Sequence, residues 1–265
     1  MIKIEDLWKN YGENQVLSGL NLEVMKGEIL VILGRSGVGK SVLLKHIIGL
    51  TKPDRGLIDI DGVKISELKG PALYKAVSNM GMLFQGGALF DSMNIEDNTG
   101  FYLKQHGNKE TGKHLSREEL RDSVNEALKM VGLEGTQMKS TSELSGGMKK
   151  RAALARLICY RPSILLYDEP TTGLDPITAM QINDLIVKTQ KELNGTSIVV
   201  THDIVSALYI GDRLALHKDG KIAYLADPDT FMEIDDPVIN FLKKMISQHP
   251  KTLKVNNSNN NTEHK

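Results

Sequence analysis

The sequence predicts an α/β protein built around a parallel sheet, and two observations support that prediction. Short apolar runs alternate with amphipathic helical stretches along most of the 265-residue chain. Three of these runs, at residues 28–34, 164–169 and 196–203, have the length of a strand. They are apolar on both faces, which is typical of strands that helices cover on both sides of a parallel sheet.

Two stretches near the N-terminus have a different pattern. Residues 1–27 and 56–65 alternate apolar and polar side chains, with turn sequences at 11–14 and 61–62. This pattern is typical of short hairpin strands. We therefore expect a small antiparallel sheet beside the parallel core.

The middle of the chain, at about residues 90–160, is expected to form a helical subdomain. Within it Ser116 precedes an amphipathic run and is followed by Glu119, the spacing of a capping box. The domain is predicted to extend over residues 1–245. Residues 249–265 are rich in Asn and nearly devoid of apolar side chains, so a disordered tail is expected there.

Composition excludes some classes of protein. The 33 Lys and Arg residues balance 33 Asp and Glu residues, whereas proteins that bind nucleic acid usually carry a basic surplus. Cys159 is the one cysteine and lies in an apolar helical stretch, so an inert buried thiol is expected. No apolar run approaches the roughly 20 residues that span a bilayer, and residues 1–10 include acidic side chains and no apolar signal core, so no export signal is expected.

Residues 34–41 form a predicted phosphate-binding loop. They read GRSGVGKS, which follows an apolar strand and precedes a helix-forming run. The glycines let backbone N–H groups approach phosphate oxygens, and the helix presents its positive N-terminus to the same anion. The expected nucleotide contacts come from Gly34, Arg35, Ser36, Gly37, Val38, Gly39, Lys40 and Ser41. Lys40 can reach the β- and γ-phosphates, and Ser41 can ligate Mg²⁺.

Two carboxylates end the apolar run at 164–169, at the strand end where ligands bind in α/β sheets. Asp168 suits the shell of the Mg²⁺ ion, and Glu169 can polarise a water for attack on the γ-phosphate. Adjacent side chains on a strand point to opposite faces, so we expect the two carboxylates to have separate tasks. An exposed acidic strand end is the alternative interpretation.

A second helix start with bare backbone N–H groups follows at LSGGM, residues 144–148. Ser145, Gly146 and Gly147 could bind an anion that belongs to another subunit, or Ser145 could simply cap the helix. Lys149, Lys150 and Arg151 come next, and we expect them to form a solvated helix face.

In order along the chain, GRSGVGKS, Gln85, LSGGM, ILLYDE, GLD and His202 resemble the nucleotide-binding domain of ABC ATPases, over about residues 1–245. This resemblance implies a P-loop NTPase fold that binds ATP and Mg²⁺ and works as a homodimer. Tyr11 resembles the aromatic residue that stacks on adenine, and Gln85 resembles the glutamine that links Mg²⁺ and water to the transport interface. His202 resembles the switch histidine on the γ-phosphate, and Asp175 resembles the aspartate that connects the two active sites.

The segment FQGGALFDSMNIEDN after Gln85 resembles the subgroup that energises MCE-type, or Mla-like, phospholipid transporters. The resemblance implies an ABC permease partner, an MCE-domain protein, and a peripheral place on the cytoplasmic face of the inner membrane. Ala88, Leu89, Phe90 and Met93 are expected to line a groove for the permease, and ordinary core residues are the alternative interpretation. A small-solute importer and a soluble ABC ATPase without transport, such as an iron–sulfur assembly factor, remain alternatives.

Overall fold

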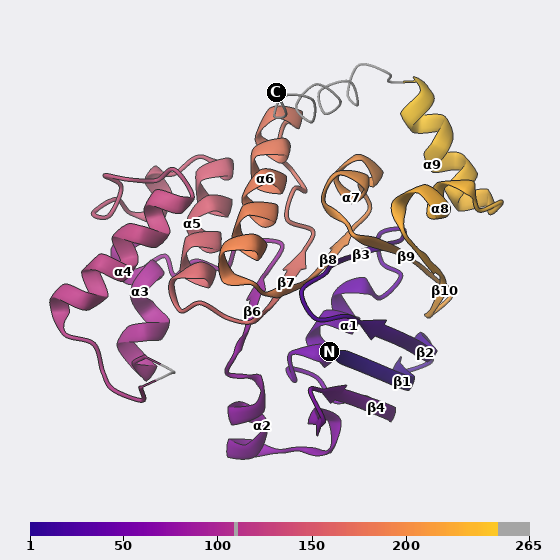
Figure 1. Cartoon of the computed structure of the whole chain (residues 1–265), viewed down its shortest axis with the longest axis horizontal. Helices are drawn as coiled ribbons and strands as arrows, with labels where there is room; N and C mark the ends of the chain where they lie inside the picture. The colour runs from indigo at the N-terminus through magenta and orange to yellow at the C-terminus, as the bar shows by residue number, and fades with distance from the viewer. Residues whose placement is uncertain (109–110, 249–265) are drawn as a thin grey trace, which may run out of the picture.

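The computed structural model describes residues 1–108 and 111–248 and confirms the predicted α/β fold with two sheets (Figure 1). The residues expected to form a disordered tail lie outside the described part of the chain. The core sheet has the strand order β10-β9-β3-β8-β7-β6. Its strands are β3 (Ile29–Leu33), β6 (Met80–Leu83), β7 (Ile164–Asp168), β8 (Thr196–Thr201), β9 (Arg213–Lys218) and β10 (Lys221–Ala226). All of its pairings are parallel except that of the edge strand β10 with β9.

The second sheet is antiparallel, as the N-terminal pattern predicts, with the order β2-β1-β4-β5. Its strands are β1 (Ile2–Tyr11), β2 (Asn14–Val24), β4 (Arg55–Ile60) and β5 (Val63–Lys64). In Figure 1 this sheet lies on the opposite side of the core sheet from α6 and α7. The hairpin between β1 and β2 turns at residues 12–13, where Gly12 has a positive φ.

The helices of the described residues are α1 (Lys40–Ile47), α2 (Gly70–Val77), α3 (Ile95–His106), α4 (Arg117–Met130), α5 (Gly146–Cys159), α6 (Pro176–Leu193), α7 (Ile204–Ile210), α8 (Pro228–Glu233) and α9 (Pro237–Gln248). Short 3₁₀ turns occur at Ile65–Glu67 and Thr141–Glu143. The capping box of α4 is confirmed, because Ser116 N–H donates to Glu119 Oε2 at 2.7 Å and Glu119 N–H donates to Ser116 Oγ at 3.2 Å. None of the helices in these ranges is long and apolar enough to cross a membrane.

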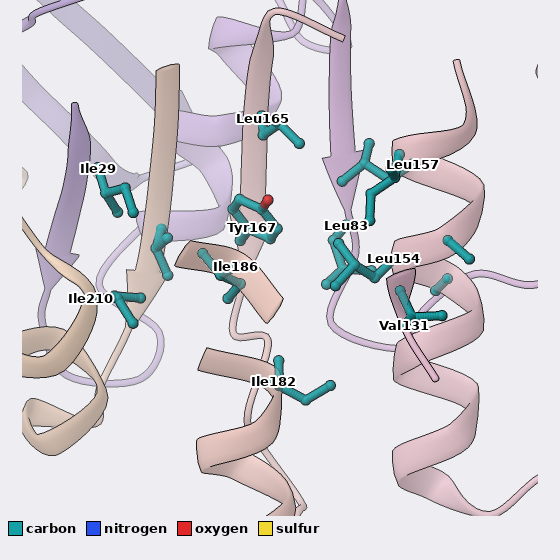
Figure 2. Packing of buried hydrophobic residues seen from close by; sticks show 14 of the residues in the cluster. Ile29, Leu83, Val131, Leu154, Leu157, Leu165, Tyr167, Ile182, Ile186 and Ile210 are labelled. Atoms are coloured by element: carbon teal, nitrogen blue, oxygen red, sulfur yellow. The ribbon is translucent and has the colours of Figure 1, made fainter. Parts of the chain in front are cut away.

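Each strand of the core sheet sends alternate side chains into two separate cores. On β3, Ile29, Val31 and Leu33 face the core beneath the helices, whereas Leu30 and Ile32 face α1 and the antiparallel sheet. Figure 2 shows the first of these cores, where the ring of the fully buried Tyr167 lies among aliphatic side chains from the sheet and helices. Burial on both faces explains why the central strands read as continuous apolar runs.

Helices α3, α4 and α5 pack on one another as a group beside the edge strand β6 (Figure 1). Cys159, near the end of α5, is buried, and burial raises the pKa of its thiol to about 12. The expected burial is confirmed, and the raised pKa disfavours the reactive thiolate.

The contact between β6 and α5 depends on Gly81. A β-carbon at this position would overlap the side chains of Leu157 and Tyr160. The φ angle of Gly81 is not positive, so close packing rather than backbone conformation requires the glycine there. Gly81 thus allows the helical group to approach the sheet closely.

We predict that Gly81→Ala lowers the free energy of unfolding by about 1–3 kcal/mol, the usual cost of overpacking a core. Urea denaturation followed by circular dichroism measures the change. Gly86→Ala is the matched control, because a β-carbon there meets no atom within 4 Å. Equal stability of the two variants would show that close packing of α5 on β6 does not require a glycine at position 81.

Candidate nucleotide-binding site

The site lies at the carboxyl edge of the core sheet. Strands β3, β8, β7 and β6 run parallel, so their carboxyl ends meet at one edge. The phosphate-binding loop follows β3, the two carboxylates end β7, His202 follows β8 and Gln85 follows β6. Sequence-distant residues of the predicted set therefore meet because of strand direction alone.

The loop after β3 closes tightly on its own backbone and on β2. Gly39 has a φ of 106° and is the N-cap of α1, and a β-carbon there would come within 2.6 Å of Val16 Cγ1. This φ lies in the left-handed region that favours glycine. The loop thus directs the N-terminus of α1 into the site, where its free N–H groups can bind an anion.

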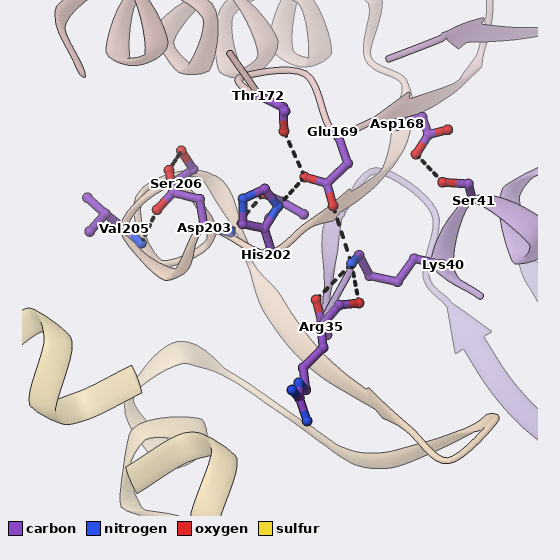
Figure 3. Close-up of polar contacts among 12 residues, drawn as sticks. Arg35, Lys40, Ser41, Asp168, Glu169, Thr172, His202, Asp203, Val205 and Ser206 are labelled. Carbon is purple, nitrogen blue, oxygen red and sulfur yellow. Dashed lines mark hydrogen bonds and ion pairs between the residues drawn. The ribbon is translucent and has the colours of Figure 1, made fainter. Parts of the chain in front are cut away.

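Lys40 and Glu169 form a buried ion pair at the centre of the site (Figure 3). Lys40 Nζ lies 3.2 Å from Glu169 Oε1 and donates to the carbonyls of Gly34 at 2.7 Å and Arg35 at 3.0 Å. The second oxygen, Oε2, lies 2.8 Å from His202 Nδ1 and accepts from Thr172 Oγ1 at 3.1 Å. Both carboxylate oxygens of Glu169 are therefore held.

The two neighbouring carboxylates have separate partners, as the sequence predicts. Asp168 is the last residue of β7, and its Oδ1 accepts a hydrogen bond from Ser41 Oγ at 2.7 Å. Glu169 lies beyond the strand with a φ of +49°, in the left-handed region. Strand alternation is thus only part of the reason for their separation, because the turn at Glu169 aims its side chain toward Lys40.

A pocket of about 300 Å³ lies between these groups. Its lining includes Ser36, Gly37, Gly39, Lys40, Ser41, Gln85, Glu169 and His202 of the predicted set, together with Val16, Val42 and Thr172. Val16, Val42 and Thr172 were not predicted, and no motif marks Val16, which reaches the loop from β2. Tyr11 is not part of this lining; it lies half exposed at the end of β1, with Lys9 Nζ 5.4 Å from the centre of its ring.

The residues of the second helix start lie away from this pocket. Ser145 caps α5 by accepting from Met148 N–H at 3.3 Å, so the capping interpretation holds within one chain. Asp175 caps α6 in the same way, with Oδ1 accepting from Ile177 N–H at 3.1 Å and Thr178 N–H at 3.0 Å. Gly146 and Gly147 open α5 beside α6, since a β-carbon on Gly147 would meet Thr178.

The expectation of a solvated basic face on α5 is correct for Lys149 and wrong for Lys150. Lys149 is exposed, whereas Lys150 is 7% exposed and donates to the backbone carbonyl of Gln85. Arg151 is half-buried. The helical pattern could not reveal this, because the partner of Lys150 is a carbonyl in a loop 65 residues earlier in the chain.

A second unexpected residue, His217 of β9, lies beneath the phosphate-binding loop. It is 1% exposed, and within the described chain neither ring nitrogen has a hydrogen-bond partner. Its backbone carbonyl and its ring approach the positions that β-carbons on Gly34 and Gly39 would take. Burial, with a further contribution from Lys40, lowers the pKa of His217 to about 4.

The glycine loop on a helix N-terminus, the buried lysine and the paired Asp–Glu define a P-loop nucleoside triphosphatase. The chain belongs to the ABC transporter family, whose model matches residues 17–172. It is an ABC ATPase, an ATP-hydrolysing component of a transporter.

Several known proteins are similar over most of the chain. The probable ribonucleotide transport ATP-binding protein mkl of Mycobacterium leprae is 39% identical, over 90% of this chain and 67% of that protein. The chain thus spans about two thirds of the length of that relative. The intermembrane phospholipid transport system ATP-binding protein MlaF of Haemophilus influenzae is 40% identical, over 92% of this chain and 90% of that protein. The methionine import ATP-binding protein MetN of Clostridium tetani is 39% identical, over 94% of this chain and 75% of that protein.

Among solved structures, the ATP-binding cassette MJ0796, in a dimeric post-hydrolysis state with ADP and phosphate, superposes with a TM-score of 0.78. It is 34% identical in sequence, and the match covers 86% of this chain and 99% of that one. The expected fold and family are therefore confirmed.

We predict that His217 makes the protein less stable in acid. Because its pKa is lower in the folded chain than the ordinary 6.5, the unfolded chain binds more protons between pH 6.5 and 4, and stability falls as pH is lowered through this range. His217→Leu should remove on the order of 1–2 kcal/mol of the loss in unfolding free energy between pH 7 and 5.

Urea denaturation at each pH measures this difference. His114→Leu is the control, because His114 is exposed and its replacement should leave the wild-type pH dependence intact. Parallel pH profiles for the wild type and His217→Leu would contradict the prediction.

Proposed function

We propose that this chain hydrolyses MgATP at the described pocket and thereby drives phospholipid transport between membranes through a permease and an MCE-domain protein. The observation that supports hydrolysis best is the placement of Glu169, whose two carboxylate oxygens face Lys40 and His202. A carboxylate in this position can accept a proton from a water that attacks a phosphate held by Lys40.

Each residue of the pocket then has a role in binding or hydrolysis. The N–H groups of residues 34–41 and the ammonium of Lys40 bind the β- and γ-phosphates. The water oxygen forms a bond to the γ-phosphorus, the bond to the bridging oxygen breaks, and Glu169 takes the proton, which yields ADP and phosphate. His202 uses Nδ1 toward Glu169, so its Nε2 can approach the γ-phosphate.

The donor set fits Mg²⁺. Ser41 Oγ donates to Asp168 Oδ1 at 2.7 Å, and Ser41 and Gln85 both line the pocket, so three residues with side-chain oxygens lie in it or beside it. Mg²⁺ in nucleotide sites takes few protein oxygens and completes its shell with phosphate and water. Accordingly, no cluster of three or more His, Cys, Asp or Glu residues suited to a metal occurs in the described ranges. When bound, the ion would neutralise charge on the β- and γ-phosphates.

We assign Ser145, Gly146, Gly147 and Asp175 to the ATP site of a second copy of the chain. They lie outside the pocket of their own chain, yet α5 begins with free backbone N–H groups suited to an anion. The similar cassette MJ0796 is dimeric, which supports a homodimer. Tyr11, exposed on the β1–β2 hairpin, is available to stack on adenine.

A phospholipid cargo is supported by the similarity to MlaF, which extends over nearly the whole of both chains. Import of a small solute is the second candidate, because the similarity to the methionine importer MetN extends over as much of this chain. We also propose a peripheral place on the cytoplasmic face of the inner membrane, because both candidate functions need a permease to which the ATPase binds.

The surface that suits a permease is the one around Phe90. Phe90 is 38% exposed, its ring lies 4.7 Å from that of Phe101 on α3, and Arg156 lies 5.5 Å from its ring centre. Ala88 is exposed as well, whereas Met93 and Leu89 are half-buried and Leu89 packs against the core. Phe90 and Ala88 are therefore the better candidates for contact with a partner.

We predict that Glu169→Gln keeps ATP binding and lowers kcat on the order of 10²-fold or more, because the amide cannot accept the proton. Phosphate release and the affinity for a fluorescent ATP analogue are the two measurements. Gln181→Ala, which alters an exposed side chain of α6 outside the pocket, is the control for folding. ATPase activity of Glu169→Gln within a few-fold of the wild type would refute the assignment of Glu169.

We predict that Phe90→Glu separates the ATPase from its permease. The purified variant should fold and bind ATP, while affinity purification from membranes should no longer recover a membrane subunit, since a charge replaces an apolar contact. Phe241→Glu is the control, because Phe241 is a more exposed phenylalanine, on α9. The subunits recovered with the wild type also test the cargo: an MCE-domain protein supports lipid transport, and a solute-binding protein contradicts it.

A further inference from the structure

Lys150 of α5 is a buried cation whose hydrogen bonds go to backbone carbonyls. Its Nζ donates to the carbonyl of Gln85 and, at 3.5 Å, to the carbonyl of Glu169. The residue is 7% exposed, and burial lowers the pKa of its ammonium. Removing an ammonium from water is costly, and an apolar side chain of similar volume often serves stability as well. Its presence therefore points to a role beyond stability.

The two carbonyls belong to residues of the ATP site that come from different strands. Gln85 follows β6 and Glu169 follows β7, and both side chains line the pocket. Lys150 thus joins the two loops without itself lining the pocket. Among the described residues of α5, Lys150 is the one whose side chain hydrogen-bonds to both the loop after β6 and the loop after β7.

The backbone of Glu169 needs such support. Its φ of +49° is a conformation that residues other than glycine rarely adopt. Its N–H donates to the carbonyl of Val200 at 3.0 Å, and its carbonyl accepts from Thr172 N–H at 3.3 Å and from Lys150 Nζ at 3.5 Å. The peptide groups on both sides of Glu169 are therefore anchored, and the direction of its carboxylate toward Lys40 and His202 depends on these anchors.

A second cation of α5 binds the same loop further along. Arg156 donates to the carbonyl of Ala88 at 2.7 Å and to that of Gly87 at 2.9 Å. Both of these residues have a positive φ. The loop that starts at Gln85 is thus held to α5 at successive carbonyls, and only Lys150 extends this connection to Glu169.

We propose that Lys150 is a positioning residue for ATP hydrolysis, which fixes the backbones of Gln85 and Glu169 relative to each other and to α5. It touches neither the nucleotide nor the attacking water and acts through the direction of the Glu169 carboxylate. Because α5 begins at Gly146, directly after Ser145, any shift of that helix end would reach Glu169 through Lys150. This inference rests on the proposed role of Glu169 in hydrolysis.

The decisive variant is Lys150→Met, which keeps most of the volume and removes the ammonium. We expect kcat to fall on the order of 10-fold or more, with KM and the affinity for a fluorescent ATP analogue within about threefold of the wild type, because the phosphate-binding loop is untouched. Lys149→Met is the matched control: the neighbouring lysine is exposed on the same helix, and both constants should stay at wild-type values.

Two further variants separate positioning from a general structural role. Lys150→Arg keeps donors for both carbonyls and should restore kcat at least partly. In a Glu169→Gln background, Lys150→Met should lower the residual single-turnover rate by less than twofold, because the side chain through which it acts is already absent. Circular dichroism and urea denaturation verify folding. If Lys150→Met does not fold, Lys150→Gln, which keeps a shorter neutral donor, is judged by the same split between kcat and KM.

A wild-type kcat for Lys150→Met would overturn the proposal, as would equal losses in kcat and ATP affinity. Full additivity with Glu169→Gln would also overturn it. These outcomes differ from failure of the proposed function, in which Glu169→Gln itself retains activity. If Glu169→Gln is inactive and Lys150→Met is fully active, hydrolysis by Glu169 stands and the positioning role of Lys150 falls.

Discussion

The parallel alignment of β3, β8, β7 and β6 is the constraint on which the rest of the structure depends. It brings the phosphate-binding loop, both carboxylates, His202 and Gln85 to one edge, although they are spread over more than 160 residues of sequence. Parallel strands need crossover connections and covered faces, and both cores meet that need. The site is therefore as rigid as the sheet beneath it, which is the requirement for groups that must meet a phosphate at fixed distances.

At that edge the buried charges of the site are compensated by groups within the site itself. Lys40 and Glu169 are both buried, and each compensates the other's charge, while backbone carbonyls and His202 complete their hydrogen bonds. Two further basic side chains, His217 and Lys150, lie near this pair and differ in charge and in hydrogen bonding. His217 is held neutral by burial beside Lys40, whereas Lys150 remains bound to carbonyls. Of these basic side chains, Lys40 and His202 line the pocket, where an anionic ligand would meet them.

Much of this arrangement could be predicted from local sequence. β3, β7 and β8 are apolar runs, and the spacing of Ser116 and Glu119 indicates where α4 begins. Each of these patterns lies within a single strand or at a single helix end, so the local sequence is enough to predict it. The motifs also named most residues of the pocket. Long-range contacts were invisible. β6 was missed because its four residues include Gly81, whose purpose lies in packing against α5. Lys150 was predicted to lie on the surface because its acceptors are backbone carbonyls. Every residue has such a carbonyl, so the sequence does not indicate which one a lysine binds.

The same physical reasoning explains why relatives with different cargoes resemble this chain almost equally. The buried strands, the pocket and the cations of α5 serve ATP and the loop after Gln85, and nothing in them contacts a transported molecule. Under the proposed function, selection for cargo acts on this subunit through the surface that meets the permease, which we propose to be the one around Phe90, in the loop that Arg156 binds to α5. Identity of about 40% to both MlaF and MetN is then expected, because most of the chain builds the ATP site, and both relatives are ATP-binding proteins. The information that separates a lipid transporter from a solute importer must be concentrated in a few exposed side chains on that surface and in the partner subunits themselves.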